Sequence, residues 1–119
     1  MKTDRELVDA AAKAGIAAGM RLFQRFRSGA QAPGQWMQST SSAGSAPLDM
    51  PWEPLDNDID ACSLILAMPL AVDFDDSTVY IHYRDQLIWE AVYSGAGERP
   101  QITRRAIVLA IASINQPHR

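Results

Sequence analysis

The acidic run Asp56-Asn57-Asp58-Ile59-Asp60 is the densest group of side chains that could do chemistry. Carboxylates at alternate positions are typical of a calcium-binding loop, but that loop also needs a glycine after Asp60 and a glutamate six positions later. This chain has alanine at both places. We therefore interpret Asp56, Asn57 and Asp58 as structural residues, whose side-chain oxygens accept from the free amides of a first helical turn. We expect no metal ion and no cofactor.

A second candidate site is the cluster of Arg21, Arg25 and Arg27 around Phe23. Arginines neutralise phosphates and an aromatic ring can stack on a base, so the cluster suits a nucleic acid. The alternative is structural, because arginines on an edge strand discourage pairing with other chains and cover apolar surface with their stems. The formal net charge of −3 adds no general attraction to nucleic acid or membrane.

Signatures of catalysis are scarce in this sequence. There is no glycine-rich phosphate loop and no G-x-S-x-G elbow, and His82 and His118 fit no zinc spacing. A hydrolase or small-molecule site would need a pocket beside Trp89 and Tyr93 with two converging carboxylates. The candidates for that pair are Asp73, Asp75, Asp76, Asp85 and Glu90. Turn-forming aspartates are expected in a β meander in any case. We expect no enzyme and no catalytic residue, with this site as an alternative.

The elements that must position these residues begin with a helix. Thr3 and Glu6 have the spacing of a capping box, so a helix should start near Asp4 and stop at Gly15. Residues 16–27 can be read as a continuation of the helix or as an edge strand. We favour the strand, because a helix through the glycines would cost about 1 kcal/mol at each of them.

Residues 28–51 are rich in Ser, Gly, Ala and Pro, and we interpret them as a long flexible loop. A short strand over residues 35–39 could pair back on residues 20–26. Trp36 is then either packed over the core, which we favour, or exposed for contact with a partner. Trp52 and Leu55 should pin the end of the loop onto the sheet.

A short helix is expected from about Asn57, with Ile59, Cys62 and Leu66 on its apolar face. Pro69 ends it. Because Cys62 has no second cysteine to pair with, we expect a buried, unreactive thiol.

The remaining residues predict a β meander and a last helix. Apolar alternation indicates strands over residues 70–74, 79–83 and 87–93, and a helix follows from Pro100 to about Ile114. Residues 106–112 carry no polar side chain, so this helix should be sandwiched or lie at a subunit contact. The pattern predicts one domain over residues 1–119, of the α+β class. It should hold an antiparallel sheet of three to five strands with helices on its faces.

The order of these elements resembles the phage ABA sandwich domain family, small phage and prophage proteins of unknown function. The resemblance is carried by the pieces Thr3-Asp4-Arg5-Glu6-Leu7, Trp52-Glu53-Pro54-Leu55, Asp56-Asn57-Asp58-Ile59-Asp60-Ala61 and Thr103-Arg104-Arg105-Ala106-Ile107-Val108. Ile59 departs from the family, whose members commonly have glycine there. The resemblance implies a three-layer α/β/α sandwich, but no activity and no catalytic residue.

Together these observations predict a non-enzymatic accessory protein encoded by a phage or prophage. It should bind an unidentified host or phage macromolecule, and a nucleic acid is an alternative partner. The surplus of apolar surface leads us to expect a homo-oligomer. No apolar run is long enough to span a bilayer, so we expect a location in the cytoplasm of a bacterial host.

Overall fold

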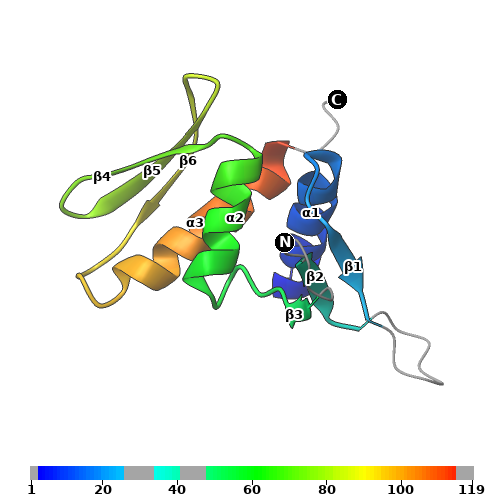
Figure 1. Ribbon diagram of the computed structural model, residues 1–119. Helices are drawn as coiled ribbons and strands as arrows, with labels where there is room; N and C mark the ends of the chain where they lie inside the picture. Colours follow the sequence, from blue (N-terminus) through cyan, green and yellow to red (C-terminus); the bar gives the residue numbers. More distant parts are fainter. Residues whose placement is uncertain (1–2, 26–33, 41–47, 115–119) are drawn as a thin grey trace.

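A computed structural model describes residues 3–25, 34–40 and 48–114 of this chain (Figure 1). Arg27 and His118, both named above, lie outside these residues. The helices and strands follow one another in the order α1 (Asp4–Ala17), β1 (Leu22–Gln24), β2 (Trp36–Thr40), β3 (Leu48–Pro51), α2 (Asp58–Ala67), β4 (Ala71–Phe74), β5 (Thr78–Tyr83), β6 (Gln86–Val92) and α3 (Arg99–Ile114).

The α+β class and the antiparallel strands are confirmed, but the strands form two sheets where we expected one. Their orders are β1-β2-β3 and β4-β5-β6. In Figure 1 the two sheets lie on opposite sides of the molecule, with the helices between them. The three-layer α/β/α arrangement is therefore not confirmed.

Helix α3 lies at the centre of the fold, with α1 and α2 on one side and β5 and β6 on the other. Its middle is buried over most of the circumference, at Ala106, Ile107, Val108, Ala110, Ile111 and Ala112. The prediction of a sandwiched helix is confirmed, because neighbours within the same chain cover the apolar run. The apolar character of α3 thus no longer supports self-association.

The capping box that starts α1 is confirmed. The Glu6 amide donates to the Thr3 hydroxyl at 3.2 Å, and the Thr3 amide donates to the Glu6 carboxylate at 3.3 Å. The expected stop at Gly15 is wrong, because the helix continues to Ala17 and Gly15 is buried within it. Gly19 makes the turn instead, with a φ of 103° that side chains rarely adopt.

Strand formation was the right alternative for the middle of residues 16–27, where β1 lies. The short strand pairing back on it is also confirmed, since Phe23 lies opposite Met37 in the β1–β2 register. The interpretation of residues 28–51 as one long loop is wrong where β2 and β3 pair. The physical reason is twofold. Trp36 and Met37 bury apolar side chains, and strand pairing supplies hydrogen-bond partners for the backbone of an otherwise polar segment.

The start of α2 near Asn57 is confirmed, but the three predicted capping residues have different roles. Asn57 is the N-cap and accepts from the Asp60 amide at 3.1 Å. Asp58 instead accepts from Arg104 of α3 at 2.7 Å. Asp56 is exposed, and no described residue bonds its side chain. The capping role predicted for Asp56 and Asp58 is therefore wrong.

The predicted apolar face of α2 is also wrong. Ile59 and Leu66 are 79% and 84% exposed, and Cys62 is exposed as well. The buried residues are Ala61 and Leu64. Because α2 is apolar around much of its circumference, spacing alone could not choose the face. In the fold, Ala61 and Leu64 pack into the core, and Asp58 pairs with Arg104 of α3 at the start of the helix.

The β meander is confirmed, and its turns explain two of the acidic residues. Asp75 accepts from the Ser77 and Thr78 amides at 2.9 Å and 2.7 Å, which closes the β4–β5 connection. Arg84 and Asp85 form the β5–β6 turn with φ of 53° and 64°. These acidic residues shape turns, as expected of a meander.

Candidate functional site

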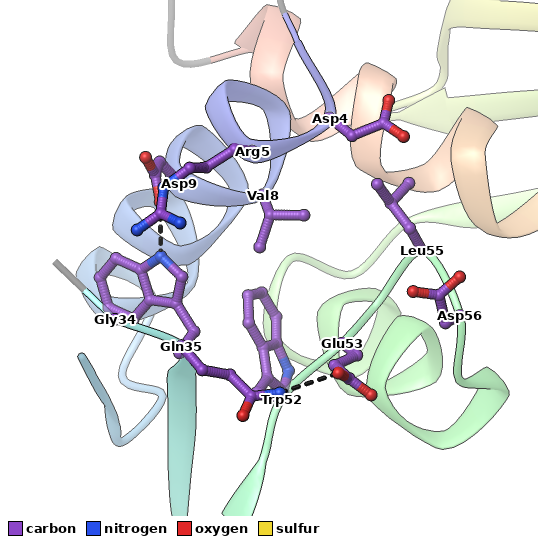
Figure 2. A pocket seen from close by; sticks show the side chains of 11 residues that line it. Asp4, Arg5, Val8, Asp9, Gly34, Gln35, Trp52, Glu53, Leu55 and Asp56 are labelled. Atoms are coloured by element: carbon purple, nitrogen blue, oxygen red, sulfur yellow. Dashed lines mark hydrogen bonds between the residues drawn. The ribbon is translucent and has the colours of Figure 1, made fainter. Parts of the chain in front are cut away.

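A pocket of about 250 Å³ lies between α1, the start of β2 and the segment over residues 52–56 (Figure 2). We call it the tryptophan pocket. Its walls are formed by Asp4, Arg5, Val8, Asp9, Gly34, Gln35, Trp36, Trp52, Glu53, Leu55 and Asp56. Three stretches distant in sequence thus meet at one concave site, a common arrangement for binding sites.

The floor of the tryptophan pocket is apolar. Figure 2 shows Val8 of α1 and Leu55 and Trp52 of the facing segment around the hollow. Trp52 is 1% exposed, and its indole nitrogen donates to the Ser63 hydroxyl of α2 at 3.3 Å. Trp52 thus anchors this segment to the core, but its ring bonds to α2 and not to the sheet that we predicted. The Trp52 amide also donates to the Trp36 carbonyl at 2.9 Å, which joins the two tryptophans through the backbone.

Trp36 packs over the core, which is the alternative that we favoured. Its ring packs against the core cluster and is half-buried, and it also lines the pocket. The indole nitrogen donates to Oδ1 of Asp9 at 2.7 Å. This bond fixes the ring between β2 and α1.

The rim of the tryptophan pocket is acidic. Four carboxylates and one arginine line it, and Arg105 of α3 pairs with one of the carboxylates, which leaves an excess of two negative charges. Most of these acids are held in place: Glu53 accepts from Gln35 at 2.8 Å, and Asp4 accepts from Arg105 of α3 at 2.7 Å. The amide of Glu53 donates to Asp60 at 2.8 Å, which holds the segment against α2. The rim is therefore a preorganised negative surface.

Carboxylates and one arginine are the charged groups in the described lining of this pocket. It contains no histidine, cysteine, serine, threonine, tyrosine or lysine, the usual nucleophiles and proton carriers besides carboxylates. Within the described part of the chain, no group of three or more His, Cys, Asp or Glu residues could hold a metal ion.

The arginine cluster is partly assembled. Arg21, Phe23 and Arg25 are exposed and alternate along β1, so they share the face opposite the buried Leu22. Backbone bonds extend the ladder to both arginines, from the Arg25 amide to the carbonyl of residue 35 and from the amide of residue 39 to the Arg21 carbonyl. Three of the four predicted residues thus form one surface.

The predicted site beside Trp89 and Tyr93 is not formed by the described residues. The hollow at Trp89 has a lining of Leu87, Ile88, Trp89 and Glu90, with a single carboxylate. Tyr93 is buried and donates its hydroxyl to the Asp75 carbonyl at 2.6 Å. The other predicted carboxylates serve the meander. Asp73 lies 3.7 Å from His82, and the Tyr80 hydroxyl, with the turn amides, lowers the pKa of Asp75.

A groove of about 380 Å³ separates α2 from β4 and the start of α3. Ile65, Val72 and Phe74 supply apolar walls, and the Arg99 guanidinium lies 5.2 Å from the centre of the Phe74 ring. Cys62 lines the groove, at helical spacing from the exposed Ile59 and Leu66. Apolar surface is thus open on this side of α2.

Sequence reasoning missed most of the tryptophan pocket, although one signal was present. Arg5, Val8 and Asp9 lie at helical spacing and share a face of α1. Nothing in the sequence indicated that Trp36 and Trp52 would meet that face.

Among the described residues, no helix is long and apolar enough to cross a lipid bilayer. No family model, curated protein or solved structure matches this chain.

Proposed function

We propose that this protein is a non-enzymatic binding protein that holds a macromolecular partner, with the tryptophan pocket as a contact site. The observation that carries the proposal is the composition of the pocket: two tryptophans and two aliphatic residues beneath a fixed acidic rim. Pockets of whole small-molecule ligands run from about 300 to 1,000 Å³. This pocket, at about 250 Å³, suits one side chain of a larger partner.

The setting is part of the same proposal. The resemblance to the phage ABA sandwich domain family supports a phage- or prophage-encoded accessory protein that acts in the cytoplasm of a bacterial host. A protein partner fits the apolar side chains that stay exposed on α2, since such surfaces favour protein contacts.

A synthetic peptide array tests the binding role with a matched pair of variants. Val8→Phe fills the tryptophan pocket from α1, whereas Val92→Phe adds the same ring at an exposed site on β6. We expect the protein and Val92→Phe to retain the same peptides, and Val8→Phe to lose them while keeping its circular dichroism spectrum. If no peptide is retained, or if folded Val8→Phe retains them equally, the proposal fails.

Nucleic-acid binding is a second candidate, favoured by the shared face of Arg21, Phe23 and Arg25. It predicts that a fluorescent single-stranded oligonucleotide binds, and that affinity falls steeply with salt. Arg25→Gln should weaken this binding and reduce its salt dependence, while Arg84→Gln on the other sheet should not. Binding that ignores salt would remove this candidate.

A further inference from the structure

We infer that the tryptophan pocket takes an organic cation, the charged end of an arginine or lysine side chain. The inference rests on the proposed function only for the partner that would carry this side chain. It is drawn from the charge, the aromatic walls and the size of the pocket.

The charge of the pocket selects a cation. Asp4 pairs with an arginine of α3, so its charge is largely matched. Three carboxylates, Asp9, Glu53 and Asp56, then share the lining with the single arginine Arg5. An anionic group would be repelled by this excess, and a cation would be attracted to it. Asp56 is exposed and has no bond to another described side chain, so it can meet the incoming charge.

The spread of the carboxylates favours an extended cation over a metal ion. Metal ions need several oxygens within bonding distance of one point. No such group exists among the described residues. Asp9 and Glu53 are also oriented by their own donors, Trp36 and Gln35. Charges placed around a hollow rather than at one point match the size of a guanidinium or an alkylammonium group.

The half-buried Trp36 ring in the wall of the pocket adds a second attraction. Cations bind over the faces of aromatic rings, and tryptophan is the strongest of these partners. Trp36 donates its N–H to the carboxylate of Asp9, and a donor bonded to an anion gains electron density in its ring. The Trp36 ring should therefore attract a cation more than an unbonded indole would. Val8 and Leu55 provide an apolar path for the alkyl stem of the ligand.

The indole N–H signals of the full chain in NMR report on this binding directly. The chain has three tryptophans, of which Trp36 and Trp52 line the pocket and Trp89 lies in a separate hollow. The probes are Nα-acetyl-arginine methylamide and its neutral isostere, Nα-acetyl-citrulline methylamide. Nα-acetyl-lysine methylamide and its Nε-acetyl derivative form a second pair. The spectra of Trp36→Phe and Trp89→Phe assign the signals.

We expect the two pocket signals to shift saturably with a charged probe, and the Trp89 signal to stay in place. The neutral member of each pair should bind at least about tenfold more weakly. Asp56→Asn should weaken binding of the charged probe several-fold. Asp76→Asn, an exposed aspartate that does not line the pocket, should leave it unchanged. Equal shifts with charged and neutral probes, or none at all, would overturn the inference.

The probe experiment tests the cation site and the peptide array tests the binding role, so one proposal can fail while the other holds. If the array retains peptides that lack basic residues, and Val8→Phe loses them, the binding role holds and the inference of a cation site is contradicted. A charged probe that binds while no peptide does would support the cation and contradict the macromolecular partner.

Discussion

The indole nitrogen of Trp36 lies 2.7 Å from Oδ1 of Asp9 and donates to it. The bond joins β2 to α1 across 27 residues of sequence, beside the tryptophan pocket. It both fixes a wall of the tryptophan pocket and ties the first sheet to the helices. Its strength therefore bears on stability as well as on binding.

The Trp36–Asp9 bond predicts a measurable coupling. Hydrogen bonds to charged groups contribute about 1.5–3 kcal/mol, and partial exposure reduces this range. We expect a coupling free energy of about 1 kcal/mol from a double-mutant cycle of Trp36→Phe and Asp9→Ala, measured by urea unfolding. Additive effects of the two substitutions would show that the bond does not stabilise the fold.

The three polar residues around the start of α2 predict an order of effects on stability. Asn57→Ala should lower the free energy of unfolding by about 1 kcal/mol, because it removes the N-cap. Asp58→Ala should cost less than about 1 kcal/mol, since its side chain is 71% exposed and its ion pair is screened by water. Asp56→Ala should change little. Urea unfolding of the three variants checks the order, and a cost for Asp56→Ala equal to that of Asn57→Ala would contradict it.

The Asp75–Tyr80 bond predicts a pH dependence near the β4–β5 turn. The Tyr80 hydroxyl donates to Asp75 at 2.6 Å, and this is the largest cause that lowers the pKa of Asp75 from its ordinary 3.8. A lowered pKa in the folded state means that Asp75 stabilises the fold above about pH 3.8, and that this contribution is lost as the pH falls through the folded pKa.

Tyr80→Phe should accordingly raise the pKa of Asp75 toward its ordinary value. A carbon-detected NMR titration of the Asp75 carboxyl measures the change. Tyr83→Phe is the matched control, because Tyr83 lies on the same strand and does not bond Asp75. A titration of Asp75 that is the same in both variants would remove Tyr80 as the cause.

Two glycines with equal space around them isolate the effect of backbone conformation. A Cβ at Gly19 or at Gly95 would meet nothing within 4 Å, but Gly19 has a φ of 103°. Gly19→Ala should destabilise the fold by about 1–2 kcal/mol, because an L side chain resists this conformation. Gly95→Ala should be neutral or stabilising by less than about 1 kcal/mol. Thermal unfolding of both variants checks the difference, and equal melting temperatures would contradict it.

The elements that could be predicted from the sequence depend on neighbours along the chain. The capping box of Thr3 and Glu6, the meander turns and the start of α2 each involve groups a few residues apart. The burial of α3 was also foreseeable, because an apolar run around a whole helix must be covered from several sides. Such features follow from local geometry and from the aversion of apolar surface to water.

The tertiary structure decided what local patterns left open. Helix α2 buries Ala61 and Leu64 in a core built from segments distant in sequence, and Cys62 is exposed where spacing predicted burial. The strands divide into two sheets because β1, β2 and β3 pair with one another and not with β4, β5 and β6. The tryptophan pocket exists because Asp9, Trp36 and Trp52 meet from separate segments. A contact between distant residues costs chain entropy that only the whole core can offset, so no single stretch of sequence contains it.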